Sequence, residues 1–268
     1  AKIRTSTGVD IEEQVEPLTH YGVFRTQKEF NSGKQAIGII LTTVNRDLKD
    51  DNLKRRLSNQ AYTVGLDGWT FLDEDETYII TGSVIGSYSS GTKDYLIRLQ
   101  QQPYRYMQRP DKTYLPLDSN RTSIAGYFSR VMLNKQKGNF YINAALGIIS
   151  PGFEYNDLGS QWLADRINGH IVTGYRWFEP DEIFRRKSVY LAYSRTSDYE
   201  DNISRSGFYM NGGGQFLNYY GFNFFGSYNF ESISTSLTRG GPKLIIPPNY
   251  SFGIEAYSDS RENIIITP

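Results

Sequence analysis

The sequence predicts an all-β fold, namely an antiparallel transmembrane β-barrel of the outer-membrane type, or a large portion of one, with about twelve strands in this chain. Hydrophobic and polar residues alternate with a period of two wherever the chain is regular, which indicates two-faced strands. The alternating runs are about ten residues long, as a tilted strand needs to cross a bilayer. The chain also combines 15% aromatic residues with a mean hydropathy of -0.51, which is typical of a sheet that needs only one apolar face.

The first part of the chain contains four predicted strands and two predicted loops. The strands are the alternating runs at residues 23–30, 35–46, 78–88 and 95–106. Turn-forming Asn, Ser and Gly residues follow the first and third of these runs. Leucines at a weakly helical spacing stand among charges in residues 48–59, and residues 103–120 contain prolines, so we expect loops in both stretches.

The middle of the chain shows the clearest alternation, in residues 121–133 and 139–149. In the second run Phe140, Leu146 and Ile148 fall on one face, and the residues between them are mostly small or polar. Gly138 supplies a turn residue between the two runs. We therefore expect them to form a β-hairpin.

The last part of the chain contains five more predicted strands, at residues 171–178, 188–196, 207–217, 219–230 and 252–257. Aromatic residues such as Phe222, Phe224 and Tyr228 share one face of the fourth of these runs. Residues 212–214 are three consecutive glycines, but no Lys-Ser/Thr pair follows them as in a phosphate-binding loop. We expect a turn between strands at this point.

Composition excludes several classes of protein. The chain has 29 Lys and Arg against 29 Asp and Glu, so no net charge would attract nucleic acid, which we exclude as a partner. Cysteine is absent, which excludes disulfides, thiol nucleophiles and Cys-ligated zinc. No run of apolar residues is long enough for a transmembrane helix. We expect no cofactor and no metal.

A soluble β-sandwich, such as a lectin, is the main alternative because its strands also alternate. Arg98 and Arg130 stand within predicted strands. Charged residues at such positions suit a water-filled lumen better than a dry sandwich core, where an unpaired charge is costly. They would also suit a solvent-facing side of a sandwich, so the two folds differ mainly in which face water touches.

Two segments carry a resemblance to a known family. Residues 149–159 read Ile-Ser-Pro-Gly-Phe-Glu-Tyr-Asn-Asp-Leu-Gly and are followed by Ala164-Asp165-Arg166, and residues 36–46 are followed by Val64-Gly65-Leu66-Asp67. Both segments resemble an uncharacterised family of outer-membrane β-barrels found mostly in Bacteroidota. In that family the barrel follows an N-terminal domain similar to family 9 carbohydrate-binding modules. The resemblance covers most of the chain.

The resemblance implies that this chain lies in the cell outer membrane of a Gram-negative bacterium. Members of the family are longer than this chain, and outer-membrane barrels tend to end on an aromatic residue, whereas residues 266–268 read Ile-Thr-Pro. We therefore expect residues 1–268 to be a single β-barrel domain that is an internal part of a larger barrel. Barrels of this kind often work in complexes, so other outer-membrane proteins are expected partners besides lipid.

The segment around the most specific part of this resemblance also holds the candidate ligand-binding residues. Carboxylate and amide oxygens next to turn-forming Pro and Gly could bind sugar hydroxyls or a hard cation. The same Asn and Asp side chains could equally cap turns by bonding to their own backbone, and a loop ion pair would be worth little if exposed. A nearby tryptophan could stack on a sugar ring. The candidates are Glu154, Asn156, Asp157, Trp162, Asp165 and Arg166.

Other candidate chemistry is weak. Four adjacent acids at residues 73–76 lack the spacing of a calcium loop, and we expect a solvated turn. His20 and His170 have no metal-binding partner at helical spacing. No Gly-x-Ser-x-Gly nucleophile motif is present, and we assign no catalytic residue.

These observations predict a barrel that binds or passes an extracellular ligand such as a glycan, rather than an enzyme. Two alternatives remain open from sequence. One is the soluble, lectin-like sandwich that binds carbohydrate. The other is a cell-surface hydrolase that uses a carboxylate pair among Glu154, Asp157 and Asp165.

Overall fold

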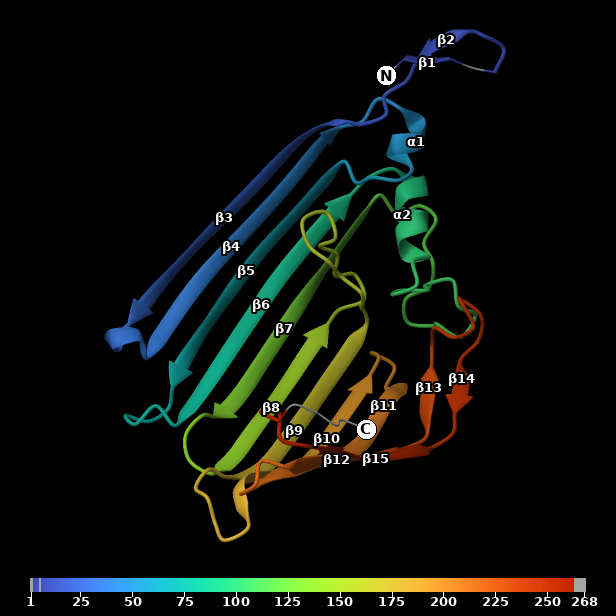
Figure 1. Cartoon of the computed structure of the whole chain (residues 1–268). Helices are drawn as coiled ribbons and strands as arrows, with labels where there is room; N and C mark the ends of the chain where they lie inside the picture. The colour runs from blue at the N-terminus through green and yellow to red at the C-terminus, as the bar shows by residue number, and fades with distance from the viewer. Residues whose placement is uncertain (1, 5, 263–268) are drawn as a thin grey trace.

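A computed structural model describes residues 2–4 and 6–262 and shows an all-β protein built around one antiparallel sheet of eleven strands (Figure 1). The strand order is β15-β12-β11-β10-β9-β8-β7-β6-β5-β4-β3, so nearly all neighbours in the sheet are also neighbours in sequence. The sheet strands are β3 (Leu18–Phe30), β4 (Gln35–Asp47), β5 (Gln60–Phe71), β6 (Tyr78–Ser90), β7 (Ser123–Lys135), β8 (Phe140–Ile149), β9 (Arg166–Trp177), β10 (Phe184–Ser197), β11 (Ile203–Phe216), β12 (Gly221–Asn229) and β15 (Asn249–Tyr257).

The remaining elements are short and lie outside this sheet. Two hairpins, β1–β2 and β13–β14, each form a separate two-stranded sheet. No helix in the described part of the chain is long and apolar enough to cross a membrane. The elements are β1 (Lys2–Arg4), β2 (Asp10–Glu12), η1 (Asn31–Gly33), α1 (Asp51–Lys54), α2 (Lys93–Gln100), β13 (Ser232–Ser234) and β14 (Leu244–Ile246).

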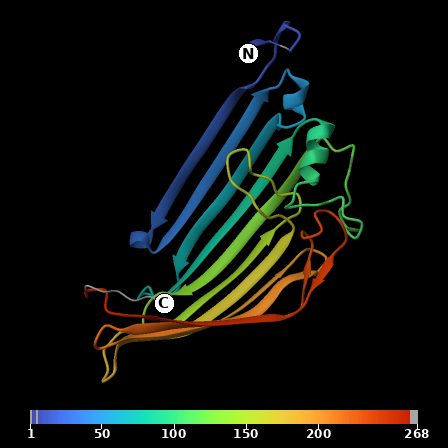
Figure 2. The same ribbon diagram turned by 45° about the vertical axis from the view of Figure 1, so that its right-hand side comes forward.

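The large sheet curves into a trough and stays open (Figures 1 and 2). Within residues 2–4 and 6–262, β3 pairs only with β4, and β15 pairs only with β12. The predicted antiparallel all-β fold is therefore confirmed, whereas a closed barrel is not formed by these strands alone. Residues 266–268, on which the expectation of a missing terminal strand depends, lie outside the described residues.

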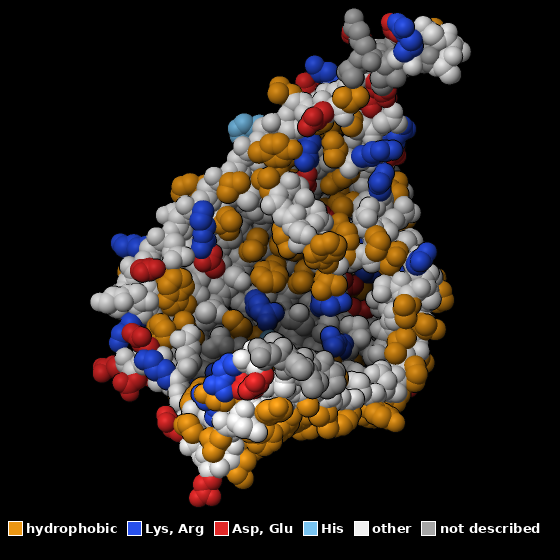
Figure 3. Space-filling model, viewed as in Figure 1, with side chains coloured by type: hydrophobic (Ala, Val, Ile, Leu, Met, Phe, Trp, Pro, Cys, Tyr) orange, Lys and Arg blue, Asp and Glu red, His pale blue; other side chains and the backbone are white. Residues whose placement is uncertain are grey.

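The convex face of the sheet is apolar and uncovered. Cross-strand partners share a face, so the pairs Leu66–Val84 and Val131–Leu146 place four aliphatic side chains side by side. These four residues are between 44% and 51% exposed, whereas the core of a soluble protein would bury such aliphatic side chains. Figure 3 shows hydrophobic side chains along the outer border of the sheet and Lys and Arg side chains in the hollow.

The concave face is polar and cross-linked by hydrogen bonds. Thr42 and Thr63 hydroxyls lie 2.6 Å apart on β4 and β5. Farther along the sheet, the His170 ring lies 2.7 Å from the Asn143 amide oxygen, and the hydroxyls of Ser227 and Ser251 lie 2.8 Å apart. The alternation in the sequence thus separates a mainly apolar convex face from a mainly polar concave face, with exceptions such as Lys28 on the convex face of β3 and Phe128 on the concave face of β7.

The predicted strand at residues 95–106 is wrong, because Lys93–Gln100 forms α2. The Thr92 hydroxyl caps this helix by accepting a hydrogen bond from the Tyr95 amide. Leu96 and Leu99 recur at helical spacing and pack with Tyr95 into a small core, so burial favours the helix over the alternating pattern. Arg98 therefore lies on a helix, so its charge gives no evidence for a water-filled lumen.

Two further differences concern strands. Residues 60–71, which we did not predict to be extended, form β5, although Val64 and Leu66 do alternate with polar residues there. The glycines at 212–214 lie inside β11 and not in a turn. The strands marked elsewhere in the sequence are present, with ends that differ by a few residues.

Connections differ sharply in length between the two ends of the sheet. At one end, residues 136–139 and 217–220 form tight turns. At the other end, residues 91–122, 150–165 and 230–248 form long connections (Figure 1). We refer to these ends as the short-turn end and the long-loop end.

Candidate functional site

The six predicted ligand-binding residues all lie at the long-loop end, in the connection at 150–165 and the first residue of β9. The structure divides them between two adjacent hollows. Glu154, Asn156 and Asp157 line a pocket of about 240 Å³. Trp162, Asp165 and Arg166 line a larger pocket of about 610 Å³, which we call the loop-end pocket.

Both hollows belong to a layer that covers the concave face at this end. We define the inner layer as residues 91–122 and 150–165. Its core is formed by Leu96, Leu99 and Met107, which pack against Ile124 of β7. A Cβ added at Gly126 would collide with the backbone of residues 152 and 153, so the inner layer lies directly on the strand backbone.

Glu154 holds the two parts of the inner layer together. Its Oε2 accepts hydrogen bonds from Arg105 Nη1 at 2.8 Å and from the Tyr104 hydroxyl at 3.1 Å. Its Oε1 accepts one from the Asn156 amide at 2.9 Å, and the Arg105 and Glu154 side chains are 0% and 2% exposed. Burial, with the nearby Glu154 carboxylate, raises the pKa of Tyr104. This carboxylate is fully occupied by partners in the protein.

The other two predicted carboxylates are also paired with cations. Asp157 accepts hydrogen bonds from Arg46 of β4 and, at 2.7 Å, from the Ser58 hydroxyl. Asp165 Oδ2 accepts one from Lys112 Nζ at 2.9 Å, and both side chains are buried. The three carboxylates therefore fasten the inner layer to the sheet or to itself. Trp162, by contrast, is 79% exposed.

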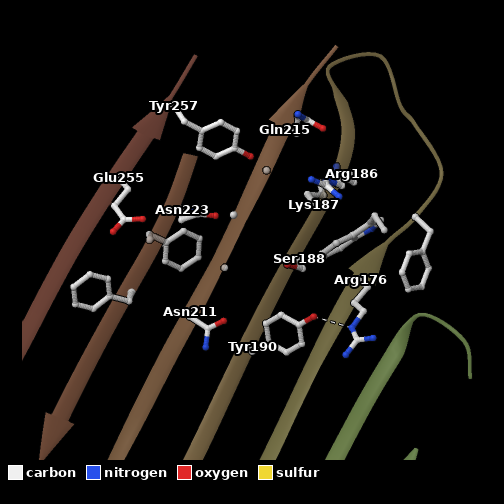
Figure 4. Close-up of a pocket in the computed structure, with 17 residues that line it drawn as sticks. Arg176, Arg186, Lys187, Ser188, Tyr190, Asn211, Gln215, Asn223, Glu255 and Tyr257 are labelled. Atoms are coloured by element: carbon white, nitrogen blue, oxygen red, sulfur yellow. Dashed lines mark hydrogen bonds between the residues drawn. The ribbon is translucent and has the colours of Figure 1, made fainter. Parts of the chain in front are cut away.

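A separate cavity of about 640 Å³ lies on the concave face toward the short-turn end, and we call it the strand cavity (Figure 4). Its floor follows one row of cross-strand partners through five strands. The row contains a cation at one edge, a glycine in the middle and an acid at the other edge, in the order Arg176, Ser188, Gly213, Asn223 and Glu255.

Three aromatic rings lie flat in the strand cavity because each covers a glycine of the adjacent strand. A Cβ at Gly174 would collide with the Tyr190 ring, one at Gly253 with the Phe225 ring, and one at Gly221 with the Tyr257 ring. A ring that lies against the neighbouring backbone turns its other face toward the cavity. The Phe225 side chain is correspondingly 48% exposed on the concave face.

Polar groups surround these rings. Arg176 Nε donates a 2.7 Å hydrogen bond to the Tyr190 hydroxyl, drawn as a dashed line in Figure 4. Asn211 and Asn223 offer amide donors and acceptors from adjacent strands. Arg186 and Glu255 form no ion pair within the described residues. The cavity thus combines exposed ring faces, planar amides and charges of both signs.

Sequence reasoning did not assign a site to these residues. The alternating pattern places Arg176 and Asn223 on the polar face, but it does not reveal which strands bring them together. Pairs of a glycine and an aromatic residue on adjacent strands could have indicated the strand cavity, but only after the register between the strands was known. No group of three or more metal-binding side chains gathers within residues 2–4 and 6–262.

Comparison with known proteins identifies one family. A family model described as "Domain of unknown function (DUF5916)" matches residues 1–267. This match agrees with the predicted membership of an uncharacterised family, while the link to Bacteroidota and to a carbohydrate-binding domain stays a prediction. No curated protein and no solved structure matches the chain.

Proposed function

We propose that this chain, which belongs to the family described as "Domain of unknown function (DUF5916)", forms the wall of an outer-membrane β-barrel whose concave face binds or passes a glycan. The observation that carries this proposal is the uncovered apolar face along eleven consecutive strands, opposite a polar face that is hollowed by the strand cavity. Outer-membrane barrels present this combination, with lipid on one side and water on the other.

The spacing of aromatic residues on the convex face fits a bilayer. Tyr78 and Tyr88 stand near opposite ends of β6, and Ile80 and Val84 lie between them on the same face. Ten residue steps span about 33 Å along a strand, or about 25 Å across a membrane at a tilt of ~40°. That distance matches the apolar band of outer-membrane barrels, whose borders carry aromatic girdles.

Closure of the barrel requires further strands. Each of the eleven strands runs antiparallel to its neighbours, so β3 and β15 at the two edges run in the same direction. They cannot pair with each other in an all-antiparallel barrel. Bacterial barrels made from a single chain have an even number of strands. We therefore propose that an odd number of additional strands completes the wall.

The lengths of the connections orient the sheet. Outer-membrane barrels have short periplasmic turns and longer extracellular loops. The long-loop end, with the inner layer, would thus face the outside, and the strand cavity would lie in the lumen toward the periplasm. A ligand entering from outside would meet the inner layer first.

The lining of the strand cavity supports a glycan as the ligand. The negative face of an aromatic ring attracts polarised C–H groups, which cover the faces of sugar rings. Amide side chains such as Asn211 and Asn223 can both donate to and accept from hydroxyl groups. Tyr190 and Phe225 supply the ring faces within one row of the sheet, since each is a cross-strand neighbour of Asn211.

The same observations weigh against the two alternatives. A soluble sandwich would bury the apolar face under a second sheet, and the described residues place none there. A hydrolase would need a carboxylate pair open to substrate. Glu154, Asp157 and Asp165 each bind a cation of the protein instead.

Cysteine scanning tests which face touches lipid, because the chain contains no cysteine of its own. Leu146→Cys would place a thiol on the convex face and Ala145→Cys one on the concave face of the same strand. In outer membranes, we expect a charged maleimide to label Ala145→Cys but not Leu146→Cys. Equal labelling of the two variants, or a monomer that stays soluble without detergent, would refute the membrane assignment.

A further inference from the structure

The loop-end pocket carries an excess of positive charge. It lies between the inner layer, the start of β9, the connection at residues 198–202 and the loop of the β13–β14 hairpin. Its lining includes four cationic side chains and two acidic ones. These are Arg105, Arg109, Lys112, Arg166, Asp165 and Asp198.

One of the buried cations has only a long ion pair, with Asp111, and neither of the two facing atoms makes a hydrogen bond. Arg105 and Lys112 each donate to a carboxylate at hydrogen-bond distance, as described above. The Arg109 side chain is 2% exposed, yet its nearest carboxylate oxygen, on Asp111, lies 3.6 Å from Nε. Arg109 Nε makes no hydrogen bond, and Nη1 reaches only the Thr235 carbonyl at 3.4 Å. A buried, incompletely bonded guanidinium is costly, and an oxyanion would satisfy it.

The mouth of the same pocket has an exposed aromatic ring. Trp162 is a large apolar side chain that no other part of the described chain covers. Exposed tryptophan beside a cationic pocket suits a ligand with both a ring to stack on and a negative group to bury. A neutral ligand could stack on the Trp162 ring but would not supply the charged hydrogen-bond acceptor that Arg109 lacks.

We infer that the loop-end pocket binds the oxyanion group of an acidic saccharide, with Arg109 and Arg166 on the oxyanion and Trp162 on the sugar ring. The oxyanion can be a carboxylate, sulfate or phosphate, since guanidinium groups bind all three. This site is separate from the strand cavity, and the inference rests on the proposed function only in taking the ligand to be a saccharide.

Tryptophan fluorescence can report binding at this site directly. The chain has three tryptophans, so the Trp69→Phe/Trp177→Phe variant retains Trp162 alone. We expect glucuronic acid to change the Trp162 emission saturably and glucose to have no comparable effect. Inorganic sulfate or phosphate should compete with glucuronic acid. Equal responses to glucose and glucuronic acid would overturn the inference, and competition by neither anion would do the same.

Charge variants locate the binding group. Arg109→Met and the less buried Arg166→Gln should each weaken glucuronic acid binding at least about tenfold in this background, because each removes a charge-assisted hydrogen bond. Arg98→Gln is the matched control, since it removes an exposed charge of the inner layer, on α2, outside the lining of the loop-end pocket. A loss as large in Arg98→Gln, or full affinity in both pocket variants, would overturn the inference.

The strand cavity provides a second control. Phe225→Ala should leave the Trp162 response unchanged, because Phe225 lies in the other cavity. A glucuronic acid response that survives while the strand cavity binds no saccharide would refute the strand cavity as a glycan site and support the loop-end site. A response to sulfate or phosphate without one to glucuronic acid would refute the assignment to a saccharide.

Discussion

The inner layer should loosen when Glu154 loses its charge. Glu154→Gln preserves the size of the side chain but leaves the Arg105 guanidinium without a counter-charge, and that side chain is 0% exposed. Removing one member of a buried ion pair costs ~3–5 kcal/mol. The lower figure applies here because the glutamine oxygen can still accept one hydrogen bond, so we expect about 3 kcal/mol.

The effect should be local. Two other ion pairs, Lys112–Asp165 and Arg46–Asp157, remain in Glu154→Gln and still hold the inner layer in place. A cost of about 3 kcal/mol raises the open population of the layer roughly 150-fold. Hydrogen exchange followed by mass spectrometry should therefore show faster exchange in peptides covering residues 93–107 and 150–158. Peptides from β9 to β11 should keep their rates.

Two variants control this prediction. Asp51→Asn breaks the exposed Lys54–Asp51 pair, which contributes little to stability because solvent screens it, and should leave the inner layer unchanged. Arg105→Met/Glu154→Leu removes both charges and should recover much of the protection lost in Glu154→Gln. Unchanged exchange in Glu154→Gln would refute the reasoning. A double variant that exchanges as fast as the single one would show that the pair acts through something other than charge.

Three further perturbations test other parts of the structure. Gly126→Ala should displace the inner layer, because the new Cβ would collide with the Phe153 backbone, and limited proteolysis of residues 101–122 should become faster. Phe225→Ala should weaken saccharide binding in the strand cavity about tenfold, as isothermal titration against an oligosaccharide panel would measure. Lys187, followed by two backbone amides, lowers the pKa of Asp181 to about 2, so the turn at 178–183 should keep its amide protection at pH 4 and lose it as the pH falls through about 2.

Each of these perturbations has a matched control. Gly82→Ala places its Cβ no nearer than 3.9 Å to another residue and should leave proteolysis unchanged. Phe222→Ala changes a phenylalanine on the convex face of the same strand, outside the lining of the strand cavity, and should not affect saccharide binding. Asp181→Asn should abolish the acid-induced loss of protection, since a lowered carboxyl pKa stabilises the turn only while the group is ionised. Equal behaviour of variant and control would contradict the prediction in each case.

The faces of the strands could be predicted from residues that are neighbours in the chain. His170 and Ile171 point to opposite sides because successive side chains in an extended backbone alternate, whatever the rest of the protein does. The prediction failed at residues 95–106, where Tyr95 and Leu99 fit either an alternating or a helical spacing. The Thr92 cap and burial against Ile124 decided for the helix.

The candidate site was predictable only as a segment. The sequence placed Glu154, Asp157 and Asp165 in one polar connection, and the structure does bring them to one end of the sheet. Their partners are remote, since Arg105 lies 49 residues from Glu154 and Arg46 lies 111 residues from Asp157. No local pattern identifies such pairs, so the choice between a ligand site and a structural anchor was open.

The alternation of side chains along an extended backbone was enough to predict an apolar face and a polar face for most strands of this protein. The length of the alternating runs indicated strands that are long enough to cross a bilayer. The register between strands decided the rest. It aligned Arg176, Asn223 and Glu255 in one row and laid Phe225 over Gly253, while the odd number of antiparallel strands left the two edge strands running in the same direction. These features depend on contacts between residues that are distant in the sequence. Such contacts form only when the whole sheet has assembled.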